Sequence, residues 1–170
     1  VMGAGGVLMP PAGYWEGVQA ILNKYDILLV ADEVICGFGR TGKMFACETF
    51  NIRPDVLVVS KQITSSYMPL SAILMNDRFY QPIADESDRI GSFGHGYTAS
   101  GHPVATAVGL ENLKIIQERD LVGHVADLQD KFLSGLAELV KHPVVHSSRG
   151  IGLIGALEIK PWTDAKPGDA

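Results

Sequence analysis

Apolar side chains recur at helical spacing in three stretches of the chain, residues 12–25, 104–118 and 121–140. The periodic positions of the first stretch are Tyr14, Trp15, Val18, Ile21 and Leu22. Pro103 stands just before the second stretch, where its fixed backbone angle suits the first turn of a helix. We therefore predict three amphipathic helices.

Short apolar runs between the helices predict strands. The expected strands cover residues 27–31, 55–60, 70–75 and, with partial alternation, 151–159. The first two have the length and composition of parallel strands buried on both faces. A short helix is also expected over residues 77–84, where Pro82 interrupts the pattern. Because strands and helices alternate early, the pattern predicts an α/β fold with parallel strand pairs and a boundary near Asp120.

Composition narrows the class of protein. Hydrophobic residues make up 46% of the 170 positions, enough for a substantial core. The net charge of −5 argues against a nucleic-acid partner, and no apolar run approaches the roughly 20 residues that span a bilayer. Cys36 and Cys47 lack the spacing of a metal site, which favours a reducing, cytoplasmic location. Both ends have the character of internal positions, so we expect a piece of a longer enzyme.

Two polar residues follow the first two predicted strands. Asp32 ends the first strand and Lys61 comes directly after the second. Sites in open α/β sheets lie beyond the carboxyl ends of strands, and apolar surroundings would make the Lys61 amine a better nucleophile. An amine and a carboxylate are the pair that pyridoxal chemistry requires, and Val34 could stack on a flat ring. The alternative is a solvated loop lysine and an aspartate that caps a helix.

Residues 37–42 spell Gly-Phe-Gly-Arg-Thr-Gly, which matches the dinucleotide-binding pattern of three spaced glycines. The context disagrees, because the first glycine does not directly follow the strand and no helix is expected to open inside the motif. A nucleotide-binding module is therefore the weaker hypothesis. A tight loop that packs against another subunit or strand is the structural alternative.

Residues 93–103 carry hydroxyls and glycines just before the predicted helix at Pro103. Backbone N–H groups at a helix start form an anion site, so phosphate binding is one interpretation. The other is plain capping of the helix by Ser100. His95 and His102 lack the spacing of metal ligands.

Three long runs, residues 31–42, 60–70 and 95–103, together resemble the class III aminotransferases, which belong to the fold type I group of pyridoxal-phosphate enzymes. The runs occur in the family's order, and the similarity extends over nearly the whole chain. The resemblance implies an α/β fold in which residues 1–118 form part of the large mixed-sheet domain. Residues 119–170 would then begin the C-terminal small domain. One departure is Ser66, where the family commonly has glycine.

The resemblance also implies roles for individual residues. Lys61 resembles the lysine that forms a Schiff base with pyridoxal 5′-phosphate and moves the proton during transamination. Asp32 resembles the carboxylate paired with the pyridine nitrogen, and Val34 the residue packed on one face of the ring. Thr98 resembles the threonine that reaches the cofactor phosphate from a partner subunit, with Tyr97 beside it. These roles imply a homodimer with shared sites, whose interface lies near the loop 37–42.

The activity implied is transfer of an amino group between an amine or ω-amino acid and a keto acid such as pyruvate. Within the class, 4-aminobutyrate, ornithine and diaminopelargonate-type aminotransferases remain alternatives, as do aminomutase and decarboxylase relatives. The resemblance also places a phosphate-cup loop and a ring-stacking aromatic residue before Val1, and a carboxylate-binding arginine after Ala170. We therefore expect the 170 residues alone to be inactive.

Overall fold

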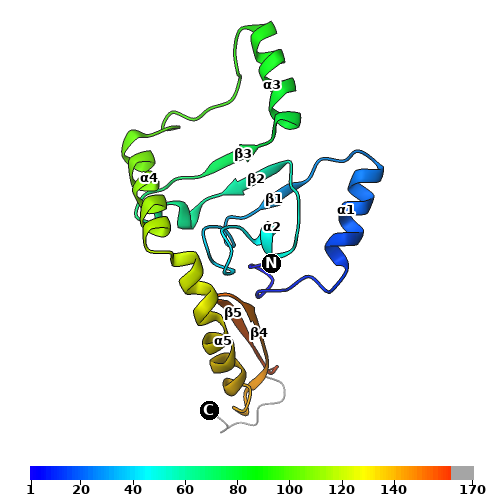
Figure 1. Cartoon of the computed structure of the whole chain (residues 1–170), viewed down its shortest axis with the longest axis vertical. Helices are drawn as coiled ribbons and strands as arrows, with labels where there is room; N and C mark the ends of the chain where they lie inside the picture. The colour runs from blue at the N-terminus through cyan, green and yellow to red at the C-terminus, as the bar shows by residue number, and fades with distance from the viewer. Residues whose placement is uncertain (162–170) are drawn as a thin grey trace.

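The computed structural model describes residues 1–161 and consists of a small sheet flanked by helices, with a helix and a hairpin at one end (Figure 1). The sheet carries α1 and α4 on opposite sides, and α5 lies with the hairpin at the C-terminal end. The elements in chain order are α1 Tyr14–Lys24, β1 Val30–Asp32, α2 Ala46–Thr49, β2 Val56–Val59, η1 Lys61–Thr64, β3 Ala72–Met75, α3 Asp77–Ile90, α4 Pro103–Glu118, α5 Leu121–Leu139, β4 Val145–Ile151 and β5 Ile154–Ile159. None of the helices within residues 1–161 is both long and apolar enough to cross a membrane.

The sheet has the strand order β1-β2-β3. β1 and β2 are parallel, as predicted, whereas β3 runs antiparallel to β2. The central strand, β2, is buried at Val56 and Val59, which are 4% and 1% exposed. This pairing fixes which ends of β1 and β2 lie together, and therefore where their terminal polar residues lie.

The first strand is shorter and more open than predicted. It begins at Val30 rather than residue 27. Just before it, the Leu29 N–H donates to the Asp55 carboxylate at 2.8 Å instead of to a strand backbone. Val30 is 55% exposed, so the expectation of a strand buried on both faces is wrong for β1. Within residues 1–161, no strand pairs with its outer edge.

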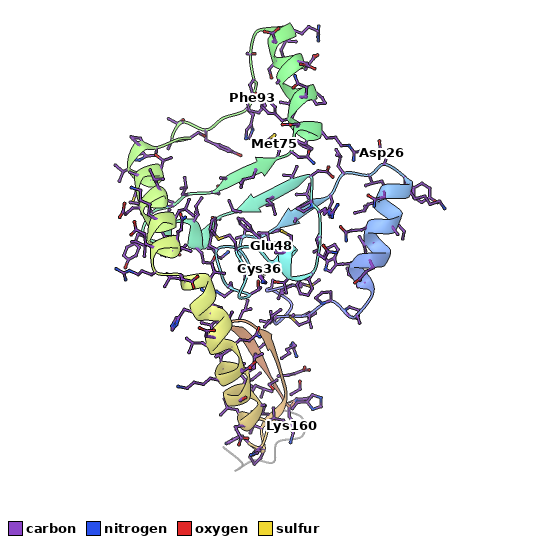
Figure 2. All side chains as sticks on the ribbon, in the orientation of Figure 1. Asp26, Cys36, Glu48, Met75, Phe93 and Lys160 are labelled. Atoms are coloured by element: carbon purple, nitrogen blue, oxygen red, sulfur yellow. The ribbon has the colours of Figure 1, made fainter. Side chains whose placement is uncertain are left out.

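Two further predictions need correction. The helix over 77–84 continues to Ile90 and contains Pro82. A proline removes one backbone hydrogen bond, and α3 tolerates this because none of its residues is buried; the helix extends away from the sheet in Figure 2, and its Arg78 pairs with Asp26. The single strand over 151–159 is a hairpin of β4 and β5 that turns at Gly152.

The loop 37–42 packs against α5 and the hairpin of the same chain. Gly42 lies against Ala126, and the Leu153 N–H donates to the Arg40 carbonyl at 3.0 Å. Gly152 has a φ of +56°, and an added Cβ would lie 2.3 Å from that same carbonyl oxygen. No helix opens inside the glycine motif, since the next one begins at Ala46. The geometry favours the packing interpretation over a nucleotide site.

Gly152→Ala is expected to lower the free energy of unfolding by about 2–4 kcal/mol, because the new methyl group overlaps Arg40 and the backbone is left-handed. Urea denaturation measures the change. Gly135→Ala is the matched control: Gly135 is an exposed position of α5 with nothing within 4 Å, so alanine should add about 0.5–1 kcal/mol there. Equal effects of the two substitutions would contradict the packing argument.

Asp55 should make stability depend on pH in the acid range. The N–H of Leu29, then the amide of Asn76 and, more weakly, Arg78 hold the pKa of this carboxyl below its ordinary value. Its contribution to stability is therefore complete above the unfolded pKa of about 3.9 and is lost as the pH falls through the lower native pKa. Urea titrations between pH 2 and 7 should show a flatter acid limb for Asp55→Asn. Superimposable acid limbs would exclude this role.

Candidate active site

Asp32 and Lys61 leave the same edge of the sheet. Asp32 is the last residue of β1 and pairs with Val58 of the parallel strand β2, which ends one residue later. The chain then passes through Ser60 into η1, whose first residue is Lys61. The side chain of Gln62 donates to the Ile35 carbonyl at 3.1 Å, which ties the two strand-end segments together. The structure therefore brings the two predicted residues to neighbouring positions.

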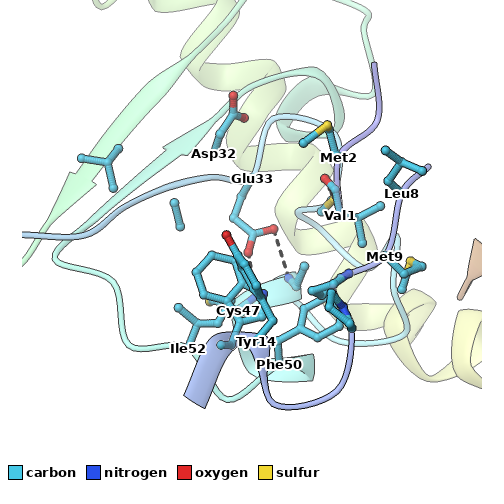
Figure 3. A pocket seen from close by; sticks show the side chains of 17 residues that line it. Val1, Met2, Leu8, Met9, Tyr14, Asp32, Glu33, Cys47, Phe50 and Ile52 are labelled. Carbon is cyan, nitrogen blue, oxygen red and sulfur yellow. Dashed lines mark hydrogen bonds between the residues drawn. The ribbon is translucent and has the colours of Figure 1, made fainter. Parts of the chain in front are cut away.

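Asp32 presents an exposed carboxylate in a fixed orientation. Its Oδ1 accepts the N–H of Val34 at 2.9 Å, which closes a tight turn just after the strand. The carboxylate points away from that of Glu33 (Figure 3). Within residues 1–161, no cationic side chain forms an ion pair with it. Val34 is half-buried beside it. The Asp32 carboxylate is thus exposed, and the turn fixes its orientation.

Lys61 differs from expectation in its surroundings. We expected an amine near apolar side chains, but the side chain is exposed, because β2 stops at Val59 and Lys61 lies beyond the end of the strand. The backbone of Lys61 is left-handed, with a φ of +41°. Such a conformation costs about 1–3 kcal/mol in a non-glycine residue and persists only where the surroundings hold it.

The turn after Lys61 is braced from two sides. The buried hydroxyl of Thr64 donates to the Met68 carbonyl at 2.6 Å. From α4, the side-chain amide of Asn112 donates to the carbonyls of Gln62 and Ile63 at 2.7 and 3.2 Å. These bonds fix the backbone that carries Lys61.

Tyr97 and Thr98 lie in the exposed loop between α3 and α4. Tyr97 is 78% exposed and meets the ring of His95 edge-on at 5.6 Å. No hydrogen bond within residues 1–161 links either side chain to Asp32, Val34 or Lys61. The structure thus joins the predicted site residues into two separate groups.

The predicted capping of α4 by Ser100 is wrong. His102, not Ser100, is the N-cap, and its Nδ1 accepts the N–H of Val104 at 3.2 Å. The Ser100 hydroxyl instead accepts the N–H of Tyr97 at 2.9 Å. Ser100 therefore shapes the loop that carries Tyr97 and Thr98.

Glu33 is a residue whose importance the sequence did not reveal. It is 3% exposed, and its two carboxylate oxygens accept the N–H groups of Ala46 and Cys47 at 3.0 and 2.7 Å (Figure 3). It thereby closes the long loop that begins beside Asp32. An acidic residue next to a candidate site carries no sequence signal of burial, so only the structure finds this role.

The two cysteines are poor nucleophiles. Both are free and buried, and burial raises the pKa of the Cys36 thiol. Burial and then the Glu33 charge raise the pKa of Cys47 to about 11. Both thiols therefore stay protonated at neutral pH.

A cavity of about 430 Å³ lies under β1, between the N-terminal segment, α1 and α2 (Figure 3). Asp32 and Glu33 are among its lining residues, and most of the others are apolar. Neither Lys61 nor Thr98 lines it. The cavity is therefore not the place where the candidate reactive groups converge.

Comparisons with known proteins agree on one family. The family model described as aminotransferase class-III matches residues 1–167. Gamma aminobutyrate transaminase 3, chloroplastic, of Solanum lycopersicum is 51% identical over 98% of this chain and 31% of its own length. Vanillin aminotransferase of Capsicum annuum is 47% identical over 99% of this chain and 36% of its own. The chain spans about a third of the length of these relatives.

A solved structure shares both the sequence and the fold. The omega transaminase from Pseudomonas jessenii, in complex with PMP, is 57% identical and superimposes with a TM-score of 0.90. The match covers 94% of this chain and 35% of that one.

Glu33→Ala is expected to cost about 2–4 kcal/mol of unfolding free energy, because it leaves two buried N–H groups without acceptors. Thermal or urea unfolding measures the loss. Glu48→Ala is the control: this exposed carboxylate accepts one N–H, from Phe45, which water can replace, so the cost should stay below about 1 kcal/mol. A Glu33→Ala protein as stable as the control would contradict the assigned role.

Proposed function

Because the chain belongs to the class III aminotransferases, we propose that it supplies the amine and the carboxylate of a pyridoxal 5′-phosphate site in an aminotransferase. The observation that carries the proposal is the placement of Asp32 and Lys61 at adjoining ends of parallel strands, both exposed at one edge of the sheet. The family is pyridoxal-phosphate dependent, and its fold type I architecture is the one described above.

The residues present fit this cofactor. Asp32 is a carboxylate without a cationic partner among residues 1–161, suited to hold a proton on a ring nitrogen. Lys61 offers an amine without an ion-pair partner in the same part of the chain. Val34 would pack on one face of the ring. When bound, the cofactor supplies an electron sink for charge that develops on the substrate carbon.

Each residue then has a defined task. Lys61 Nζ takes a proton from the substrate carbon and returns it at the neighbouring position, which requires a mobile side chain on a fixed backbone. Asp32 keeps its orientation because its Oδ1 accepts the N–H of Val34. Thr98, with Tyr97 beside it, would bind the phosphate from the partner subunit.

The proposed substrates are an amine or ω-amino acid as donor and a keto acid such as pyruvate as acceptor. The 57% identity to an omega transaminase supports this choice over the other class III activities. A 4-aminobutyrate aminotransferase is the second candidate, because four relatives are named gamma aminobutyrate transaminases, at 49–51% identity.

A homodimer is proposed on the same basis. Tyr97 and Thr98 are exposed and lie apart from Asp32 and Lys61 in hydrogen bonding, as expected of groups that serve a neighbouring site. Large apolar side chains are also uncovered on the sheet, among them Val30, Ile73 and Leu74. We further propose a division into a large domain, 1–118, and the start of a small domain, 119–170, and a cytoplasmic location. The 170 residues alone remain expected to be inactive.

Lys61→Ala is expected to lower transamination by about 10³-fold or more in the complete gene product that contains these residues. The physical reason is the loss of the only group proposed to move the proton. Borohydride reduction of the unsubstituted protein, followed by peptide mass spectrometry, should place the cofactor on Lys61. Lys114→Ala removes an exposed lysine of α4 paired with Glu111 and should leave the activity unchanged. Full activity of Lys61→Ala would overturn the proposal.

A further inference from the structure

We propose that Asn112 of α4 is a positioning residue for Lys61, an inference that rests on the proposed function. One side-chain amide uses both of its polar atoms on the turn that Lys61 begins. Nδ2 donates to the carbonyls of Gln62 and Ile63 at 2.7 and 3.2 Å. Oδ1 accepts the hydroxyl of Ser65 at 2.7 Å. Only a side chain with a donor and an acceptor can make this set of bonds.

The turn needs such a brace because its backbone is strained. Lys61, Ser65 and Ser66 all have positive φ, at 41°, 49° and 63°. Each non-glycine residue in this region costs energy, and three within six positions would relax unless outside contacts held them. Inside the turn, the Ser65 N–H donates to Gln62 and the Ser66 N–H to Lys61, at 3.1 and 3.2 Å. Asn112 adds the bonds that come from another element.

The face of α4 explains how Asn112 reaches the turn. One turn earlier, Gly109 lies so close that an added Cβ would be 2.9 Å from Leu70 and 3.6 Å from the Ile63 carbonyl. Ala105, another turn earlier, is 2% exposed. Small residues thus let the helix approach, and Asn112 fills the next position on the same face. The helix beside η1 is visible in Figure 1.

If Asn112 served only to stabilise the fold, its removal would lower the free energy of unfolding and leave kcat unchanged. Asn112 is only half-buried, and its bond with Ser65 is at the surface, so its removal exposes little apolar area. The main consequence is a turn free to relax, with the Lys61 amine displaced from its working position. Displacement of a reacting group by about 1 Å can cost up to 10²-fold in rate.

The test compares Asn112→Ala, Asn112→Asp and Ser65→Ala in the complete gene product. We expect kcat to fall about 10–100-fold in Asn112→Ala while KM for the amino donor changes little. Asn112→Asp loses the donor and should be impaired, whereas Ser65→Ala, which loses one bond, should show a smaller loss. Asn76→Ala is the matched control, since this helix-capping asparagine lies at the opposite end of β2–β3 and should leave kcat unchanged.

A second readout does not depend on bound cofactor. In the cofactor-free protein, amide hydrogen exchange at Ser65 and Ser66 should be about tenfold faster in Asn112→Ala, and unchanged in Asn76→Ala. If Asn112→Ala fails to fold, Asn112→Asp carries the same two measurements. Unchanged kcat and unchanged exchange would overturn the positioning role even where Lys61 binds the cofactor. Failure of borohydride to attach the cofactor to Lys61 would instead defeat the proposed function, and exchange alone would then decide on Asn112.

Discussion

The parallel pairing of β1 with β2 is the constraint on which the candidate site depends. It aligns Asp32 with Val58, and this register brings the carboxylate and the Lys61 turn to one edge of the sheet. A shift by one residue would turn Asp32 to the other face, because side chains alternate along a strand. Neighbouring bonds protect the register: the Glu33 N–H continues the ladder to the Val58 carbonyl at 2.9 Å. After the strands end, the side chain of Gln62 donates to the Ile35 carbonyl and connects the segments that follow β1 and β2.

The same strand exit also connects the site to the C-terminal part of the chain. Buried Glu33 closes the loop after Asp32. The Arg40 carbonyl of this loop then accepts the N–H of Leu153, next to the hairpin turn at Gly152. Within the same hairpin, the Arg149 side chain of β4 donates to the Gly6 carbonyl at 2.6 Å. The glycine motif is therefore a structural junction, which explains its close glycines without a bound nucleotide.

Periodicity in the sequence was enough to predict α1, α4 and α5, because apolar side chains recur at helical spacing in each. It also placed Asp32 and Lys61 after neighbouring strands, and the resemblance gave the family. The sequence pattern did not predict that Lys61 is exposed, since the exposure of a residue after a strand depends on which other segments cover the strand end. The hairpin was missed because β4 is rich in polar residues and pairs locally with β5. Contacts such as those of Asn112 and Glu33 arise only when distant segments meet.

The exposure of Asp32 and Lys61 follows from the geometry of the sheet. The sheet described here has three strands, and its first strand has an unpaired edge among residues 1–161. At the end of such a sheet, Asp32 and the Lys61 turn form one side of a site, and both residues are exposed within residues 1–161. Tyr97 and Thr98 are the opposite case: they project from the molecule on a loop that the Ser100 hydroxyl and the edge-on contact with His95 hold in shape. The two groups therefore do not meet within residues 1–161, and this separation is the observation on which the proposed homodimer rests.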